Sequence, residues 1–207
     1  MTNDGILSSV RKYYSDRISK YGATAKGVDW RDEDSQELRF EQFNYLWAGE
    51  TSFSLNDIGC GYGALFDYLS RAGLRVEYCG VDLSPEMLAK GRSLHEAQPL
   101  VSWHEGSEAP ARLDYTVASG ILNVKGDTPV DEWRPYVFEN IDAMARSSTK
   151  GFAFNVLSMH SDPPKRQPHL FYADPGEVID YVGTRISRHL MLTQSYGLYE
   201  FTVIVRL

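Results

Sequence analysis

The spacing of apolar residues changes near residue 50. Before that point they recur three or four positions apart, as on one face of a helix. The first run comprises Ile6, Val10, Tyr14, Ile18 and Tyr21, and the second comprises Phe40, Phe43 and Trp47. A polar stretch, GATAKGVDWRDEDS, separates the two runs. The pattern predicts two helices within residues 1–50.

From residue 51 onward, short apolar runs alternate with helical stretches. The runs typical of strands are SFSLNDIG, LRVEYCGVDL, LVSWHEG, LDYTVASGI and GFAFNVLS. Ser84, Pro85 and Glu86 form a helix start, with a capping hydroxyl, a proline at the first position and an acid near the positive end of the dipole. Strands that alternate with helices predict a doubly wound, Rossmann-like, mostly parallel α/β sheet with helices on both faces.

The chain ends in two further strand-like runs, RISRHLMLT and LYEFTVIVRL, separated by QSYG. Four residues are too few for a helical crossover, so these strands should form an antiparallel hairpin. The sheet should then have about seven strands and an antiparallel C-terminal strand. In the absence of repeats or linkers, we expect a single domain over 1–207. Residues 1–50 would form a helical lid, and 51–207 the core with a long loop at 158–174.

Composition narrows the possible functions. The chain has 207 residues, of which 43% are hydrophobic and 24% charged, and its net charge is −7. An acidic balance argues against a nucleic-acid partner, and no apolar run is long enough to predict a membrane span. The two cysteines, Cys60 and Cys79, have neither disulfide-like nor zinc-type spacing, so we predict buried thiols and no metal. We expect a cytoplasmic protein.

The stretch LNDIGCGYG carries the candidate chemistry. Gly59, Gly61 and Gly63 stand where the first strand of the core leads into its helix, and missing side chains there let the backbone turn sharply beside a ligand. The helix start behind them offers free N–H groups. Asp82 ends the next strand, where a carboxylate can accept hydrogen bonds from ribose hydroxyls. These features predict a site for an adenosine-containing ligand.

The glycines alone do not identify the ligand, because the segment from Gly59 to Ala64 also fits the relaxed GxGxxA pattern of dinucleotide binding. Asp57 is more informative. A carboxylate at the strand end would repel a pyrophosphate but would attract an ammonium or sulfonium cation. S-adenosylmethionine carries both cations.

Three segments, LNDIGCGYG, GVDLSPEMLAKG and DYTVASGILN, resemble the first, second and fourth motifs of class I S-adenosylmethionine-dependent methyltransferases. The resemblance extends from about residue 53 to the end, and an antiparallel final strand is also typical of that fold. It implies that a methyl group is moved by in-line displacement. It also implies a set of cofactor-binding residues: Asp57, Gly59, Cys60, Gly61 and Gly63 around the methionine part, Asp82 on the ribose, and Leu83 and Met87 along the adenine.

Other positions of the cofactor site are less sharply defined. The third motif of the family usually supplies a polar residue beside the adenine amino group, and HEGSEAP offers either Ser107 or Glu108. Ser119, with the two residues that follow it, would line the floor. Arg39 is a candidate partner for the carboxylate of the donor, because its planar fork suits that group.

The methyl acceptor is predicted by elimination. LDYTVASGILN lacks the Asn-Pro-Pro-aromatic motif of nucleic-acid amino-methylating enzymes, and the chain lacks the two-glutamate loop of protein arginine methyltransferases. We therefore expect a small-molecule acceptor, with oxygen as the first choice of atom, and a monomer or homodimer. The candidate catalytic residues are His160 as a general base, Asn123 and Tyr14. Two alternatives stay open, an NAD(P)-dependent oxidoreductase and a non-catalytic nucleoside-binding module.

Overall fold

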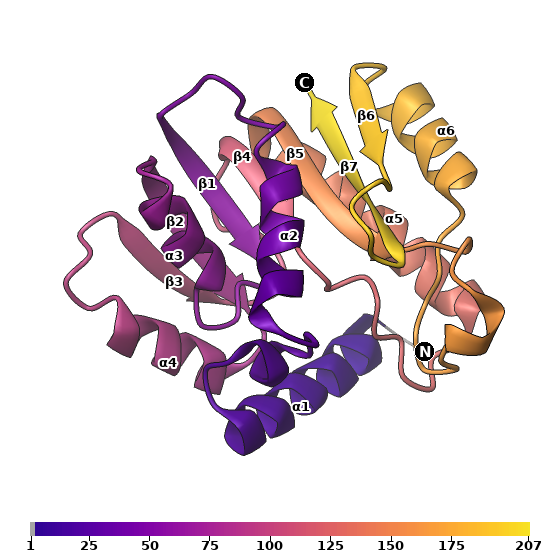
Figure 1. The fold of residues 1–207 in the computed structure, drawn as a ribbon, viewed down its shortest axis with the longest axis horizontal. Helices are drawn as coiled ribbons and strands as arrows, with labels where there is room; N and C mark the ends of the chain where they lie inside the picture. Colours follow the sequence, from indigo (N-terminus) through magenta and orange to yellow (C-terminus); the bar gives the residue numbers. More distant parts are fainter. Residues whose placement is uncertain (1–2) are drawn as a thin grey trace.

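A computed structural model describes residues 3–207 as a seven-stranded sheet flanked by helices (Figure 1). The strands are β1 (Ser52–Ile58), β2 (Arg75–Asp82), β3 (Val101–Glu105), β4 (Leu113–Ala118), β5 (Ser148–Leu157), β6 (Leu190–Thr193) and β7 (Glu200–Arg206). Their order is β3-β2-β1-β4-β5-β7-β6. The first five run parallel, and β7 runs antiparallel to both β5 and β6. The predicted fold class is confirmed.

Helices cover both faces of the sheet. They are α1 (Asn3–Tyr21), α2 (Glu33–Phe43), α3 (Ala64–Arg71), α4 (Pro85–Leu94), α5 (Val130–Arg146) and α6 (Pro175–Arg185). The buried side chains of α2 and α3 share one hydrophobic cluster, and those of α5 and α6 share the cluster on the other face. The helix start expected at Ser84 is present, since its hydroxyl accepts a hydrogen bond from the Met87 N–H at 3.3 Å.

The C-terminal hairpin forms as predicted, but its strands are shorter than expected. Arg185 still belongs to α6, and β6 begins only at Leu190. Tyr199 belongs to the strand-like run LYEFTVIVRL, but it precedes β7 and is 45% exposed. Its hydroxyl instead donates a hydrogen bond to the Asp162 carboxylate at 2.6 Å. A local polar partner outside the strand accounts for the difference.

Helix α1 lies across the end of the sheet at which the parallel strands finish (Figure 1). Ile6 and Ile18 of its predicted apolar stripe are buried, but Tyr21 at its end is exposed. The Tyr21 ring lies under the Arg17 guanidinium, 5.2 Å from its centroid, and so packs on the helix itself rather than on the core. The first two residues of the predicted lid region lie outside the described residues.

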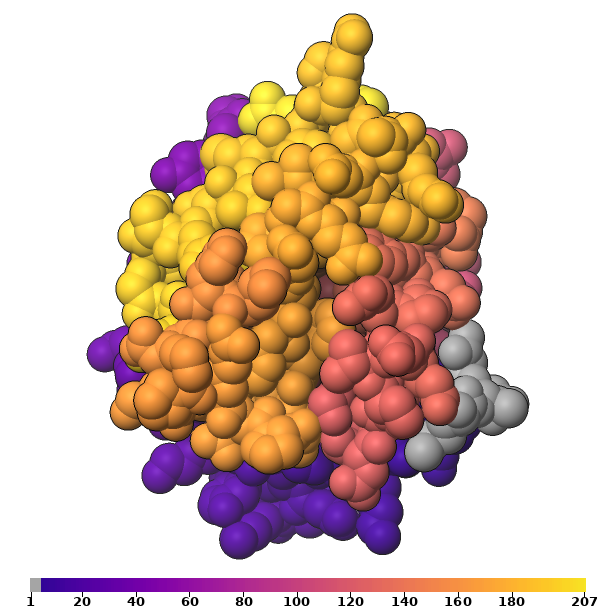
Figure 2. Space-filling view, turned by 90° about the vertical axis from the view of Figure 1, so that its right-hand side faces the viewer, coloured from indigo at the N-terminus to yellow at the C-terminus, as the bar shows by residue number. Residues whose placement is uncertain are grey.

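The segment 158–174 has little regular structure, as expected, but it is tied to its neighbours. The Phe171 N–H donates to the Asn123 carbonyl at 2.8 Å, and the Ala173 N–H donates to the Leu157 carbonyl at 2.8 Å. Phe171 and Ala173 are buried in the core. Figure 2 shows this segment between the C-terminal part of the chain above it and the N-terminal helices below.

The cysteines, the potential metal ligands and the helix lengths can be described for residues 3–207. Cys60 and Cys79 are both free thiols and both buried. Within that range, no group of three or more potential metal-ligating side chains is close enough to hold an ion. None of the helices in the described part of the chain has the length and apolar character needed to span a membrane.

Candidate functional site

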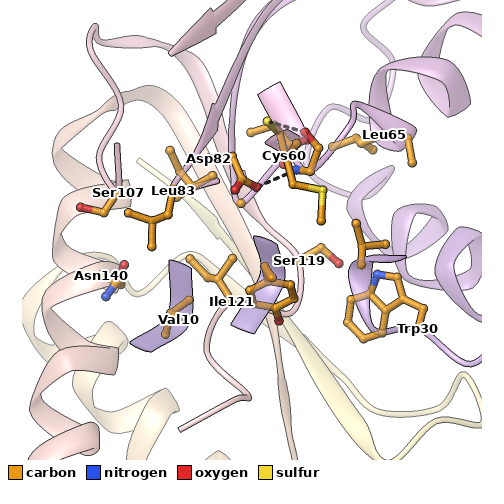
Figure 3. Close-up of a pocket in the computed structure, with 18 of the residues that line it drawn as sticks. Val10, Trp30, Cys60, Leu65, Asp82, Leu83, Ser107, Ser119, Ile121 and Asn140 are labelled. Carbon is orange, nitrogen blue, oxygen red and sulfur yellow. Dashed lines mark hydrogen bonds between the residues drawn. The ribbon is translucent and has the colours of Figure 1, made fainter. Parts of the chain in front are cut away.

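A cavity lies at the carboxyl ends of β1, β2 and β4, where the strand order reverses (Figure 3). This is the position at which open α/β sheets usually bind ligands. We call it the first cavity. Its walls come from the turn after β1, the end of β2, the loops after β3 and β4, helix α5 and the N-terminal segment. Of the cofactor-binding residues predicted from the sequence, it brings together Asp57, Gly59, Cys60, Gly61, Asp82, Leu83, Met87 and Ser119.

Gly59 and Gly61 form the floor of the turn after β1. Both have left-handed backbone angles, with φ values of 73° and 56°. A Cβ atom on Gly59 would lie 2.1 Å from the Ile121 side chain, and one on Gly61 would lie 2.8 Å from the Val28 side chain. The turn therefore needs bare glycines both for its conformation and because two other segments close over it.

Gly63 has a different role from the one predicted. It is the N-cap of α3 and does not border the first cavity. A Cβ atom there would lie 2.6 Å from the Trp103 ring and 3.0 Å from the His95 ring. Gly63 thus lets two aromatic side chains pack beneath the turn, and it supports the cavity from outside.

Asp82 holds the turn in place through both of its carboxylate oxygens. Oδ2 accepts a hydrogen bond from the Gly61 N–H at 2.9 Å, and Oδ1 accepts one from the Ser84 N–H at 2.8 Å. Burial raises the pKa of this carboxyl group, although the backbone N–H donors oppose the shift. Each oxygen keeps a lone pair for a further donor, so the group can also accept from a ligand hydroxyl.

Asp57 borders the first cavity from the end of β1. It is only 3% exposed, and the Tyr78 hydroxyl donates a hydrogen bond to its Oδ2 at 2.5 Å. Burial raises the pKa of Asp57 to about 7, against the lowering effect of the Tyr78 hydrogen bond. Among residues 3–207 the carboxyl group has no cationic partner. A cation that entered the cavity would stabilise its ionised form.

Cys60, Leu83 and Met87 supply apolar surface to the first cavity. Burial raises the pKa of the Cys60 thiol well above its usual value, so the group stays protonated and behaves as a small apolar side chain. Leu83 lies toward the end of the cavity opposite Cys60 (Figure 3). Met87, from the first turn of α4, is buried and lines the same cavity.

The loop after β4 is positioned by a residue that the sequence analysis missed. The Asn155 side chain on β5 accepts a hydrogen bond from the Gly120 N–H at 2.8 Å and donates one to the Ser119 hydroxyl at 3.0 Å. Ser119 lines the first cavity. A fully buried asparagine inside an otherwise apolar strand was the available signal, because a buried amide requires partners.

The loop after β3 contains both residues that the sequence offers for the adenine amino group, Ser107 and Glu108. Ser107 lines the first cavity, whereas Glu108 is exposed and lies outside it. Asn140 of α5 lines the same end of the cavity as Ser107 (Figure 3). Asn140 lies outside the sequence motifs, but it is one helical turn from the buried Tyr136, a spacing that places it on the inner side of α5.

A second cavity adjoins the first. The two have three lining residues in common, Tyr14, Val28 and Trp30, all from the N-terminal segment. The second cavity is otherwise lined from α2, the loop after β4, the end of β5, and the segments before β7 and around Leu170.

Arg39 lines the second cavity rather than the first. Its Nε lies 2.8 Å from the Glu200 carboxylate, and Glu200 is fully buried. The guanidinium also lies 3.8 Å from the centroid of the Trp30 ring. Arg39 therefore already has a buried anionic partner, and the structure does not bring it to the predicted carboxylate site in the first cavity.

The three predicted catalytic residues have different surroundings. Tyr14 lines both cavities, and burial together with the nearby Asp29 carboxylate raises the pKa of its hydroxyl. Asn123 lines the second cavity, and its Oδ1 accepts a hydrogen bond from the Leu157 N–H at 2.9 Å. His160 is exposed and lines neither cavity, because it stands on the outer part of the segment after β5. This placement does not support a general-base role for His160.

Comparison with known proteins is consistent with this architecture. Residues 56–147 match the Methyltransferase domain family. The chain is 40% identical over 154 residues to Rv1506c of Mycobacterium tuberculosis, a protein provisionally named a methyltransferase; the match covers 74% of this chain and 93% of the relative.

Two solved structures share the fold at low sequence identity. The magnesium protoporphyrin IX methyltransferase of Synechocystis, with bound S-adenosylmethionine, has a TM-score of 0.66 and 15% identity, covering 100% of this chain and 98% of its own. The 1,6-didemethyltoxoflavin-N1-methyltransferase of Burkholderia thailandensis has a TM-score of 0.63 and 20% identity, covering 100% and 91%. The relative from Mycobacterium shows that the chain belongs to the methyltransferase family, and the sheet order and the two solved structures show that it has the fold of class I S-adenosylmethionine-dependent methyltransferases.

Proposed function

We propose that the protein transfers a methyl group from S-adenosylmethionine, held in the first cavity, to a small-molecule acceptor held in the second. The observation that carries this proposal is that the two cavities adjoin, since Tyr14, Val28 and Trp30 line both of them. An acceptor in one cavity can meet a donor in the other there. S-adenosylmethionine supplies a methyl group already activated by its sulfonium charge, so the protein mainly has to position the acceptor and exclude water.

The residues of the first cavity fit this donor. Asp57 is a buried carboxyl group without a cationic partner among the described residues, and the ligand would supply ammonium and sulfonium charges. Asp82 is tied to the turn by its two backbone hydrogen bonds and keeps lone pairs for ribose hydroxyls. A pyrophosphate would place negative charge near both carboxyl groups, which disfavours a dinucleotide.

The N-terminal segment would act as the lid over both ligands. The Tyr13 hydroxyl donates to the Asp29 carboxylate at 2.6 Å, and Arg17 forms an ion pair with Asp29 at 2.8 Å. These contacts fasten α1 to the residues that precede Trp30. Because Val28 closes over Gly61, this segment would need to move for the donor to enter.

We further propose oxygen as the accepting atom. Asn123 lines the second cavity, where its amide N–H can orient the oxygen of an acceptor hydroxyl group. Tyr14 would serve as a hydrogen-bond donor and not as a base, since its raised pKa keeps it protonated. The names of the two solved relatives, a porphyrin and a toxoflavin methyltransferase, support a small-molecule acceptor.

Calorimetric titration tests the donor assignment. We expect S-adenosylhomocysteine to bind with micromolar affinity and NADH not to bind. Asp82→Ala should weaken the first interaction by about 1–3 kcal/mol, the usual cost of losing hydrogen bonds to a charged group. Asp114→Ala is the matched control, because Asp114 also accepts a backbone hydrogen bond, from the Ser54 N–H at 3.0 Å, but does not line the cavity. Binding of NADH instead would indicate the oxidoreductase alternative.

A turnover assay tests the acceptor site. Hydroxylated and carboxylated small molecules would be incubated with enzyme and S-adenosylmethionine, and methylated products detected by mass spectrometry. Asn123→Asp keeps the oxygen that accepts from the Leu157 N–H but removes the amide donor. We expect this variant to lower turnover while leaving S-adenosylhomocysteine affinity unchanged. Donor binding without turnover of any acceptor would instead favour the nucleoside-binding module.

A further inference from the structure

The side chains that line the second cavity differ in what they offer a bound molecule. Hydrogen-bond donors remain free there, whereas the groups that could accept a proton are engaged. Trp30 lines both cavities, and Figure 3 shows it at the end of the first cavity away from Ser107 and Asn140. A methyl group would pass to the acceptor near this end. The groups that face the second cavity therefore decide in which form the acceptor is bound.

Three side chains of the second cavity carry N–H or O–H groups without a hydrogen-bond partner among residues 3–207. The Asn123 Oδ1 accepts from the Leu157 N–H at 2.9 Å, which leaves its Nδ2 as a donor. Arg39 donates through Nη1 to the Ser35 carbonyl, and its Nη2 has no such partner. The Tyr14 hydroxyl also has none, and its raised pKa keeps the proton on it. Asn123 and Arg39 are only 5% and 8% exposed, so their free donors need a partner inside the cavity.

The carboxyl groups near the second cavity are not free to take a proton. Asp29 supplies the only carboxylate among the described residues that line it. One Asp29 oxygen lies 2.8 Å from the Arg17 guanidinium, and the other accepts from the Tyr13 hydroxyl at 2.6 Å. Protonation of Asp29 would break that ion pair. Asp57 and Asp82 line the first cavity alone, and no histidine of residues 3–207 lines either cavity. A neutral hydroxyl would thus find no free base.

We propose, on the basis of the function proposed above, that the acceptor binds as an oxygen anion, either a carboxylate or an acidic phenol or enol that has lost its proton. The donor groups of Asn123, Arg39 and Tyr14 would hold its oxygens. In the transfer, an oxygen lone pair forms the new C–O bond while the C–S bond breaks and leaves its electron pair on sulfur. The oxygen anion and the sulfonium both become neutral, and no proton has to move. Their opposite charges also draw the acceptor toward the donor.

Binding to the protein saturated with S-adenosylhomocysteine tests the charge of the acceptor. The probes are two matched pairs, benzoate with benzamide and 4-nitrophenol with 4-nitroanisole. We expect benzoate to bind roughly 10-fold or more tightly than benzamide in calorimetry. The phenol and phenolate forms of 4-nitrophenol absorb at different wavelengths, so its spectrum shows which form is bound. We expect the phenolate, with an affinity that falls about tenfold per pH unit below the pKa of the probe.

Two tyrosine variants test which hydroxyl holds the anion. Tyr14 and Tyr199 both line the second cavity, but the Tyr199 hydroxyl already donates to the Asp162 carboxylate at 2.6 Å. Tyr14→Phe should reduce the preference for benzoate over benzamide by roughly threefold or more. Tyr199→Phe, the matched control, should retain the preference. Thermal unfolding and titration with S-adenosylhomocysteine would establish that each variant is folded and binds the donor product.

The outcomes separate this inference from the proposed function. No binding of S-adenosylhomocysteine to the wild-type protein would overturn both. If that compound binds but neither anion binds, or the neutral probe of each pair binds as tightly as its partner, only the charge of the acceptor is overturned. Methylation of an aliphatic alcohol, whose hydroxyl keeps its proton near neutral pH, would overturn it as well. An unchanged preference in Tyr14→Phe would remove Tyr14 from the set of donors.

Discussion

Donor binding should be linked to the loss of a proton from Asp57. In the unliganded protein, burial raises the pKa of this carboxyl group to about 7 from an ordinary value of 3.8. A ligand ammonium or sulfonium group would favour the carboxylate and lower that pKa again. The proposed complex therefore requires the ionised form, while the empty cavity favours the neutral one.

The size of the effect follows from the pKa. At pH 6 roughly nine in ten Asp57 carboxyl groups are protonated, and at pH 8 roughly one in ten. Binding of S-adenosylhomocysteine should then release about 0.9 proton at pH 6 and about 0.1 at pH 8. The dissociation constant should be about tenfold larger at pH 6 than at pH 8. Within residues 3–207, no histidine lines the first cavity to contribute a second titration in this range.

Calorimetry in buffers of different ionisation enthalpy measures the released proton directly. Asp57→Asn is the matched control, since an amide oxygen can still accept the hydrogen bond from Tyr78 but the group cannot ionise. This variant should bind the ligand more weakly, release no proton and show little pH dependence. If the wild-type protein releases no proton at pH 6, the linkage of Asp57 ionisation to binding is wrong.

The raised pKa of Asp57 also predicts how the free energy of unfolding changes with pH. Because the folded protein holds this proton more tightly than the unfolded chain, its stability should fall as pH rises from about 4 to about 7. The loss from this one group approaches about 4 kcal/mol above pH 7. Asp57→Asn removes the cost of a buried charge, so this variant should be more stable than the wild type at pH 8 although it binds donor poorly. Urea unfolding at pH 5 and pH 8 would measure this difference.

Two further predictions concern packing around the site. Gly91→Ala would put a Cβ atom 2.6 Å from the Trp103 ring and should destabilise the fold by about 1–3 kcal/mol. Gly183→Ala is the control within another helix. Its Cβ atom would lie 3.6 Å from the nearest side chain, Leu190, and the change should stabilise the fold by up to about 1 kcal/mol. Equal urea midpoints for the two variants would contradict this account. Arg39→Met should cost about 3–5 kcal/mol by leaving Glu200 buried without its partner. The double variant Arg39→Met with Glu200→Leu should regain most of that loss, and an Arg39→Met protein as stable as the wild type would refute the argument.

Local patterns gave most of the fold. The period of apolar residues predicted the strands and helices, because burial on one face imposes a period of two or 3.6 residues on any short window. The four-residue connection before β7 predicted the antiparallel hairpin for a similarly local reason. Boundaries were less accurate at α6 and β6, where residues 185–193 were assigned to one strand but contain the end of a helix and an irregular turn.

The candidate site residues divide into those that local sequence motifs predict and those that depend on contacts between distant segments. Asp57, Gly59 and Asp82 lie in motifs attached to strand ends, and parallel strands bring those ends to one edge of the sheet whatever the rest of the chain does. The pairing of Arg39 with Glu200 joins residues that are far apart in the sequence, so no local window contains it. The exposure of His160 depends likewise on how the segment 158–174 docks against the loop after β4.

The sequence alone determined that this protein builds a doubly wound sheet with a nucleoside-type turn at the end of β1, since both follow from short-range spacing. Only the tertiary structure decided that Gly63 makes room for Trp103, that Asn140 on α5 lies at the end of the cavity beside Ser107, and that the N-terminal segment lines both cavities. Each of these depends on side chains from separate elements that meet in space. Such contacts are set by the packing of whole helices on the sheet, and local spacing does not encode them.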